Sequence, residues 1–251
     1  MIMKSCLINP MGTSPMVASE MVDFFKSDYD KSLKDVIMIV TSDERIISGS
    51  YMAGSAIRVR FSDVHTHYVM LSSSDIMDEK NLYEFVDKIG GIIKNEKEKY
   101  GIDKIYANIS GGRKIESIII SNFSQLLGID EVWIVINKNI ANYNIEFERI
   151  LNELENFKEG ENLEYYKKNQ DKFDPIFYPK RSELSFFEIP SIRLSVEDLK
   201  ILKELLKGKD LEIMNIPDYK VDAFIKSKLL ANNKKRSIPT ELGEIIFKYI
   251  T

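Results

Sequence analysis

Five short apolar runs, each followed by a segment with helical spacing of apolar residues, constrain most strongly how this chain folds. The apolar runs cover residues 4–9, 36–42, 64–71, 102–109 and 131–136. The helical patterns that follow the first four begin near residues 15, 44, 78 and 115. Regular alternation of this kind predicts an α/β fold, with a doubly wound and mostly parallel sheet. In such sheets, ligands bind at the carboxyl ends of the strands, near the switch in strand order.

The character of the chain changes twice after this pattern. Residues 141–190 begin with a helical pattern and continue into Asp174–Arg181, where two prolines favour extended backbone. We expect this part to be a helical connector and an extended arm, which is either a plain linker or a segment that returns to the binding site. Residues 191–251 are expected to form a separate module. Its order of capped helix, second helix over Asp218–Leu230, basic turn and last helix over Glu244–Ile250 predicts a winged helix-turn-helix.

Composition narrows the class of protein. A single cysteine, Cys6, lies in an apolar run and cannot form an internal disulfide, which favours a reducing, cytoplasmic setting. No apolar run reaches the roughly 18 residues of a membrane span, and we expect neither a membrane partner nor a signal peptide. The net charge of -4 is uneven, because residues 191–251 hold 12 Lys and Arg against 9 Asp and Glu. A basic tail permits nucleic-acid contact without demonstrating it.

A glycine-rich turn follows the fourth apolar run, in the sequence Ser110-Gly111-Gly112-Arg113-Lys114. Glycines allow a tight turn and a close approach of the backbone to a ligand. The helix that begins after this turn presents free N–H groups and a partial positive charge, and Arg113 and Lys114 add two cations. The turn is therefore predicted to bind an anion, with phosphate the expected one.

Polar turns also follow the first two apolar runs. Gly12-Thr13-Ser14-Pro15 ends the first, with Ser14 a candidate N-cap for the next helix, and Ser42-Asp43 ends the second, where either residue can cap. The glycine turns match neither the P-loop nor the dinucleotide fingerprint. His65 and His67 have no cluster of cysteines or carboxylates at ligand spacing, so no metal site and no cofactor are expected.

Gly12-Thr13-Ser14-Pro15 and Asn108–Lys114 together resemble the motifs of the CARF domain, found in CRISPR-associated proteins of type III systems. The resemblance covers about residues 1–140 and implies a Rossmann-like CARF domain that binds cyclic oligoadenylate. A CARF domain joined to a winged helix-turn-helix is similar to CARF-type ring nucleases, which degrade the ring, and to CARF-type transcription regulators. The Gly-Thr-Ser-Pro form of the first motif resembles the ring nucleases more closely.

The resemblance also implies a homodimer with cyclic tetra-adenylate on its two-fold axis, and a set of site residues. The residues implied to bind the ring are Gly12, Thr13, Ser14, Ser42, Asp43, Ser110, Gly111, Gly112, Arg113 and Lys114. Cleavage in such enzymes needs no metal, because the ribose 2′-OH attacks the neighbouring phosphorus. The expected catalytic residues are Ser14, Arg113 and Lys180, with Lys168 a weaker alternative for Lys180. The alternative function is a ligand-controlled DNA-binding regulator. A further alternative for the tail is that it covers the ring or extends the dimer interface.

Overall fold

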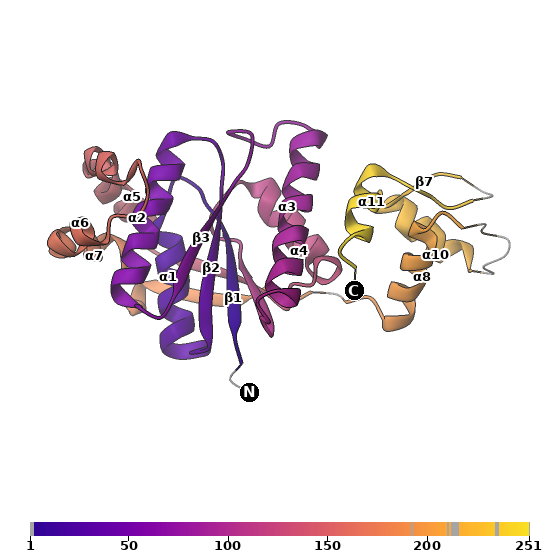
Figure 1. Ribbon diagram of the computed structural model, residues 1–251, viewed down its shortest axis with the longest axis horizontal. Coiled ribbons are helices and arrows are strands. Elements are labelled where there is room, and N and C mark those ends of the chain that lie inside the picture. The colour runs from indigo at the N-terminus through magenta and orange to yellow at the C-terminus, as the bar shows by residue number, and fades with distance from the viewer. Residues whose placement is uncertain (1–2, 192, 210, 212–215, 234–235, 251) are drawn as a thin grey trace.

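A six-stranded sheet forms the centre of the computed structural model, which describes residues 3–191, 193–209, 211, 216–233 and 236–250 (Figure 1). The strand order is β3-β2-β1-β4-β5-β6. The five parallel strands are β1 (Ser5–Pro10), β2 (Leu33–Val40), β3 (His65–Met70), β4 (Lys104–Asn108) and β5 (Glu131–Asn137). All six residues of β1 are buried, as expected for a central strand covered on both faces. The prediction of a mostly parallel α/β sheet is confirmed.

Helices cover both faces of this sheet (Figure 1). One layer consists of α1 (Met16–Phe24) with its π-helical end (Phe25–Tyr29), α2 (Glu44–Arg60), α5 (Ile140–Arg149), a 3-10 segment (Leu151–Phe157), α6 (Leu163–Lys168) and α7 (Gln170–Phe177). The other layer consists of α3 (Glu79–Glu98) and α4 (Lys114–Leu127). The chain crosses from one layer to the other between β3 and β4, so the strand order switches between the neighbouring strands β1 and β4. In the described part of the chain, no helix has the length and apolar character of a membrane span.

The connector departs from expectation in two places. Residues 174–177 are not extended, because they form the end of α7 with Pro175 inside the helix. The buried side chains of Phe173, Ile176 and Phe177 recur at helical spacing, and their burial outweighs the hydrogen bond that proline cannot donate. After a short 3-10 turn (Arg181–Glu183), residues 184–188 form β6, an additional strand that runs antiparallel to β5.

The C-terminal module follows β6. It contains α8 (Val196–Leu206), α10 (Asp218–Lys226), a hairpin of β7 (Leu230–Ala231) and β8 (Ile238–Pro239), and α11 (Glu241–Phe247). The order of elements agrees with the predicted one, whereas the assignment as a winged helix-turn-helix stays a prediction. Residues 212–215, together with Lys234 and Lys235 of the expected basic turn, lie outside the described residues.

Two helix boundaries in this module differ from the sequence-based ones. The helix expected to reach Leu230 ends at Lys226, because Lys228 adopts a left-handed φ of 60° and Leu230 pairs in the hairpin. The last helix begins at Glu241 rather than Glu244, since the Thr240 hydroxyl accepts the Gly243 N–H at 3.1 Å and caps it there.

The module packs against the layer of α3 and α4, away from the face that α1 and α2 cover (Figure 1). Lys248 and the Tyr249 hydroxyl both contact Asp87 of α3, at 3.0 and 2.8 Å. Near the end of α4, the Gln125 amide donates to the Leu194 carbonyl at 3.0 Å and accepts the Leu194 N–H at 2.6 Å. The linker to the module is therefore attached to the end of α4.

Candidate functional site

Two loops meet at the carboxyl edge of the sheet, where the strand order switches. The first loop, residues 10–15, follows β1, and the second loop, residues 109–113, follows β4. A Cβ atom on Gly12 would lie 3.1 Å from the Gly112 nitrogen, and one on Gly111 would clash with the Pro10 carbonyl. The two backbones thus touch, and a side chain at either glycine would force them apart. The structure brings together the two motifs that the sequence predicted to form one site.

Two buried asparagines hold the loops in register below this contact. The Asn108 amide donates to the Asn9 side-chain oxygen at 2.5 Å and to the Val17 carbonyl at 3.2 Å, which joins β4, β1 and α1. The Asn108 oxygen accepts both the N–H and the hydroxyl of Ser110, at 3.0 and 2.6 Å. Ser110 in turn accepts the Val135 N–H of β5 at 2.6 Å. Its hydroxyl is committed within the protein, so the expected ligand contact from Ser110 needs a rearrangement.

Glu116 accepts a hydrogen bond from the Arg113 N–H, one of the N–H groups expected to bind phosphate. Its carboxylate accepts the Arg113 N–H at 2.6 Å, as the third helical residue does in a capping box. The Glu116 side chain is 1% exposed, and this burial raises its pKa to about 7 despite the hydrogen bond from Arg113. The Arg113 N–H is therefore unavailable to a ligand, which corrects the sequence-based assignment for that group.

The side chains of Arg113 and Lys114 are exposed at the start of α4. Arg113 Nε lies 3.2 Å from Asp75, which belongs to the segment after β3. Within the described part of the chain, Lys114 makes no ion pair and the N–H groups of Gly111 and Gly112 donate no hydrogen bond. These groups are open to an anion at this edge.

Ser14 of the first loop is not a helix cap. The helix follows Pro15, and the Ser14 hydroxyl donates instead to the Asn144 side-chain oxygen of α5 at 2.7 Å. Pro15 has a φ of -67°, which matches the helix and lets it begin without a side-chain cap. Across the residues that the structure describes, no hydrogen bond comes from the N–H groups of Gly12, Thr13 and Ser14, and the Thr13 side chain is exposed.

The turn after β2 serves mainly to begin α2. Asp43 caps the helix, accepting the N–H groups of Arg45 and Ile46 at 2.9 and 3.1 Å. The Ser42 side chain is exposed, and its N–H donates to the Ser73 carbonyl at 3.0 Å. Asp43 was expected to cap or to bind the ring. Its carboxylate fills the first role in this structure, and Ser42 is the residue free to contact a ligand.

Arg45 and Asn144 are site residues that the sequence motifs did not indicate. Together with Thr13 they line a hollow of about 200 Å³ beside the first loop. Arg45 forms an ion pair with Glu148 of α5, while its Nε is buried and has no partner in the described part of the protein. The sequence feature that could have indicated Arg45 is its position in the first helical turn after the Asp43 cap. Asn144 had none, because it lies 130 residues from Ser14.

Lys180 lies on another side of α5 from Ser14. The Tyr143 hydroxyl of α5 donates to the Glu183 carboxylate at 2.5 Å. The same hydroxyl lies beside the Lys180 backbone. The neighbouring residue Asn144 contacts Ser14, and successive helical side chains point about 100° apart. Among the contacts of the described residues, none joins Lys180 to Ser14, and the role of Lys180 as a catalytic cation stays a prediction. Lys168 is exposed at the end of α6.

A second buried acid lies under the first loop, in α1. Glu20 is 1% exposed and accepts the Asn137 amide at 2.8 Å, while its other carboxylate oxygen has no partner in the described part of the chain. Burial raises the pKa of Glu20 to about 7, and the Asn137 hydrogen bond opposes this only in part. Each of the two helices that begin at the loops thus carries one buried glutamate of raised pKa.

Comparison with known proteins gives one family match. The model of the family described as CRISPR-associated protein NE0113 (Cas_NE0113) matches residues 14–219. No curated protein matches the chain. Among solved structures, Enterococcus italicus Csm6 bound to cyclic hexa-2′-fluoro-hexa-dAMP is similar, with a TM-score of 0.45 and 14% sequence identity. The match covers 98% of this chain and 54% of the Csm6 chain, so this chain spans about half the length of that protein.

Proposed function

Because the chain belongs to the family of CRISPR-associated protein NE0113, we propose that its two loops bind a cyclic oligoadenylate, which the protein then cleaves as a ring nuclease. The observation that carries the proposal is the backbone contact between Gly12 and Gly112 at the switch between β1 and β4. This contact places the N–H groups of Gly12, Gly111 and Gly112, which donate no hydrogen bond among the described residues, at one edge of the sheet, where open α/β sheets bind nucleotides.

The charges around the loops suit a chain of phosphates. Lys114 and Arg113 approach from the start of α4, and Arg45 approaches from the first turn of α2. In the free protein, Arg45 and Arg113 are paired with Glu148 and Asp75. A phosphate can replace either carboxylate, because it also accepts charge-assisted hydrogen bonds from a guanidinium. Both ion pairs are partly exposed, so breaking them costs about 1 kcal/mol or less each.

A ring of four adenylates fits a symmetric pair of such sites. In a homodimer, the loops of both protomers would meet at the two-fold axis, and each protomer would contact the same groups on two nucleotides. We therefore propose cyclic tetra-adenylate as the ligand and a homodimer as the binding species.

The proposed chemistry uses a nucleophile that the ligand itself supplies. The ribose 2′-oxygen attacks the adjacent phosphorus, the bond from phosphorus to the 5′-oxygen breaks, and the 2′-proton leaves while the 5′-oxygen gains one. The products carry a 2′,3′-cyclic phosphate and a 5′-hydroxyl. The protein has to align the 2′-oxygen in line with the leaving group and stabilise charge on the phosphorane.

Ser14 is the proposed residue for that alignment. Its hydroxyl donates to Asn144, so its oxygen is held in a fixed position with a lone pair free to accept the ribose hydroxyl. Arg45 is the first cation to test for charge stabilisation, because it lines the same hollow as Thr13. Arg113 and Lys180 are the further candidates, although Lys180 would have to approach from the other side of α5 or from a second protomer.

The decisive experiment incubates the full chain with cyclic tetra-adenylate in EDTA and resolves the linear products. We expect products with cyclic-phosphate ends from the wild type, and at least a hundredfold lower rate for Ser14→Ala with nearly unchanged affinity for the ring. Ser191→Ala, an exposed linker position, serves as the matched control. Absence of turnover over hours would contradict the enzyme assignment, and a filter-binding measurement would then show whether the ring binds at all.

A DNA-binding regulator is the second candidate. The order of helix, helix, hairpin and helix in residues 191–251 favours it, together with the net charge of +3 in this segment. This charge is small for a protein whose affinity would come mainly from neutralising phosphates. Binding to a promoter duplex that weakens steeply with salt, and changes when cyclic tetra-adenylate is added, would favour the regulator.

A further inference from the structure

A second cavity lies at the opposite, amino edge of the sheet, between β2, β3 and the end of α3. Its volume is about 320 Å³, and its walls combine polar side chains with apolar ones. The polar residues that matter here are Asp35 of β2, His67 of β3 and Glu96 of α3. The apolar wall consists of Ile37, Val69, Ile92 and Ile102. The volume falls at the lower end of the roughly 300 to 1,000 Å³ that small-molecule sites occupy.

Glu96 lacks a partner in this cavity. Its side chain is only 8% exposed, yet in the part of the chain that the structure describes its carboxylate accepts no hydrogen bond and forms no ion pair. Burial raises the pKa of Glu96, the nearby Asp35 raises it further, and His67 opposes both. Burial raises the pKa of the Cys6 thiol on β1, and both carboxylates raise it further. Glu96 thus lines the cavity with a carboxylate that no described protein group contacts, which leaves it available to a ligand.

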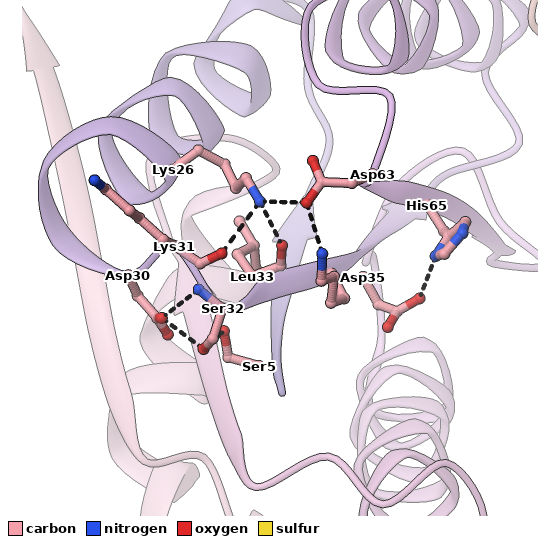
Figure 2. A network of polar contacts seen from close by, with 10 residues as sticks. Ser5, Lys26, Asp30, Lys31, Ser32, Leu33, Asp35, Asp63 and His65 are labelled. Atoms are coloured by element: carbon pink, nitrogen blue, oxygen red, sulfur yellow. Dashed lines mark hydrogen bonds and ion pairs between the residues drawn. The ribbon is translucent and has the colours of Figure 1, made fainter. Parts of the chain in front are cut away.

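Several neighbouring charges at this edge are satisfied within the protein. Figure 2 shows Lys26 between the Asp63 carboxylate, at 2.9 Å, and the carbonyl of Leu33, at 3.2 Å. Asp35 accepts His67 Nε2 at 3.0 Å and lies 3.6 Å from His65 Nδ1. Glu96 therefore differs from its surroundings. Lys4 also lines the cavity, and it is exposed and makes no ion pair with any described residue.

We propose that this cavity binds a small organic cation, a primary ammonium group on a short apolar chain. Glu96 would accept the ammonium group, Asp35 held by His67 would supply a second acceptor, and the isoleucine and valine wall would contact the chain. A metal ion suits the cavity less well, because no three acidic, histidine or cysteine side chains in the described parts of the chain come together to hold one. The cavity of about 320 Å³ has room for a small organic molecule between its polar and apolar walls.

The test measures binding of n-butylamine and 1,4-diaminobutane to the full chain by calorimetry and by the shift in melting temperature. 1-Butanol is the neutral match for n-butylamine, and sodium chloride at equal ionic strength controls for salt. We expect saturable binding of the amines and none of the alcohol. Glu96→Gln should weaken amine binding at least tenfold, whereas Glu98→Gln, two residues along α3 and exposed, should leave it unchanged.

The glutamine variant should fold, because it removes an unpaired buried charge while keeping the shape of the side chain. Without ligand, its melting temperature should equal or exceed that of the wild type, and only the wild type should gain stability from the amines. Equal amine binding by Glu96→Gln, or equal binding of the alcohol, would overturn the proposal. Saturable binding of Mn²⁺ or Zn²⁺ without binding of either amine would overturn it in favour of a metal site.

Discussion

The two loops at the carboxyl edge use their polar groups in different ways. In the second loop, the Ser110 hydroxyl bridges Asn108 and Val135, and the Arg113 N–H is bonded to Glu116. In the first loop, the N–H groups of Gly12, Thr13 and Ser14 donate no hydrogen bond within the described chain, and Ser14 makes a single contact through its hydroxyl. The second loop is thus largely a scaffold that holds the first in position, while the first is open to a ligand.

This difference shows that a motif residue is not always available for binding. Both loops follow strands of one parallel pair and both contain glycine, so their sequences suggested equivalent roles. The hydrogen bonds of Ser110 and Arg113 are made with buried partners, which are Asn108 of β4, Val135 of β5 and Glu116 of α4. Four substitutions test whether the division into scaffold and open loop is correct, and we give them in order of decreasing expected effect.

Gly112→Ala should have the largest effect. Gly112 has a φ of 73°, and an added Cβ would lie 2.7 Å from Pro10 Cβ and clash with the Glu116 carboxylate. Left-handed backbone costs an alanine about 1–2 kcal/mol and overpacking about 1–3 kcal/mol, so we expect unfolding by urea to show a loss of about 4 kcal/mol. Gly101→Ala is the matched control, because Gly101 has a φ of 65° with no atom near the added Cβ. Equal losses for both variants would contradict the close contact between the loops.

Glu116→Gln should change how stability depends on pH. The pKa of Glu116 is about 7 in the folded protein against 4.5 for an ordinary glutamate, so the native state holds a proton that the unfolded state has lost. The stability of the wild type should therefore fall as pH rises from about 4.5 to 7. At about 1.4 kcal/mol for each change of one in pKa, Glu116 contributes on the order of 3 kcal/mol to this fall.

Glutamine can still accept the Arg113 N–H, so the variant should keep the helix cap and lose this part of the pH dependence. Guanidinium unfolding at pH 5 and pH 8 measures the change. A variant whose advantage over the wild type does not grow between these two pH values would show that Glu116 is ionised in the folded protein at pH 5.

Ser110→Ala should lower the free energy of unfolding of the protein more than Ser14→Ala does. Ser110→Ala leaves the buried Val135 N–H without an acceptor, which should lower the free energy of unfolding by about 2 kcal/mol. Ser14→Ala removes one partly buried hydrogen bond and should cost about 1 kcal/mol or less. The reverse order in thermal or urea unfolding would mean that the first loop, rather than the second, is the scaffold.

Sequence patterns predicted the sheet and the meeting of the two loops, because buried strands and the rule for ligand sites in parallel sheets are local and general features. They did not predict β6, since Leu184–Glu188 is short and follows a helix that contains Pro175. Arg45 and Asn144 also escaped prediction. Their place beside Thr13 depends on how α2 and α5 pack, and this packing joins positions separated by up to 130 residues.

Helix α4 is a single continuous helix that connects the candidate site to the C-terminal module. It begins at Lys114, beside the second loop, and in its last turn Gln125 grips the Leu194 backbone of the linker through two hydrogen bonds. Its 14 residues span about 21 Å, and a helix of that length behaves as a stiff lever. A tilt of ~5° about its first residue would move its far end by ~2 Å. A displacement of the second loop that tilts α4 would therefore also move the point where the module is attached.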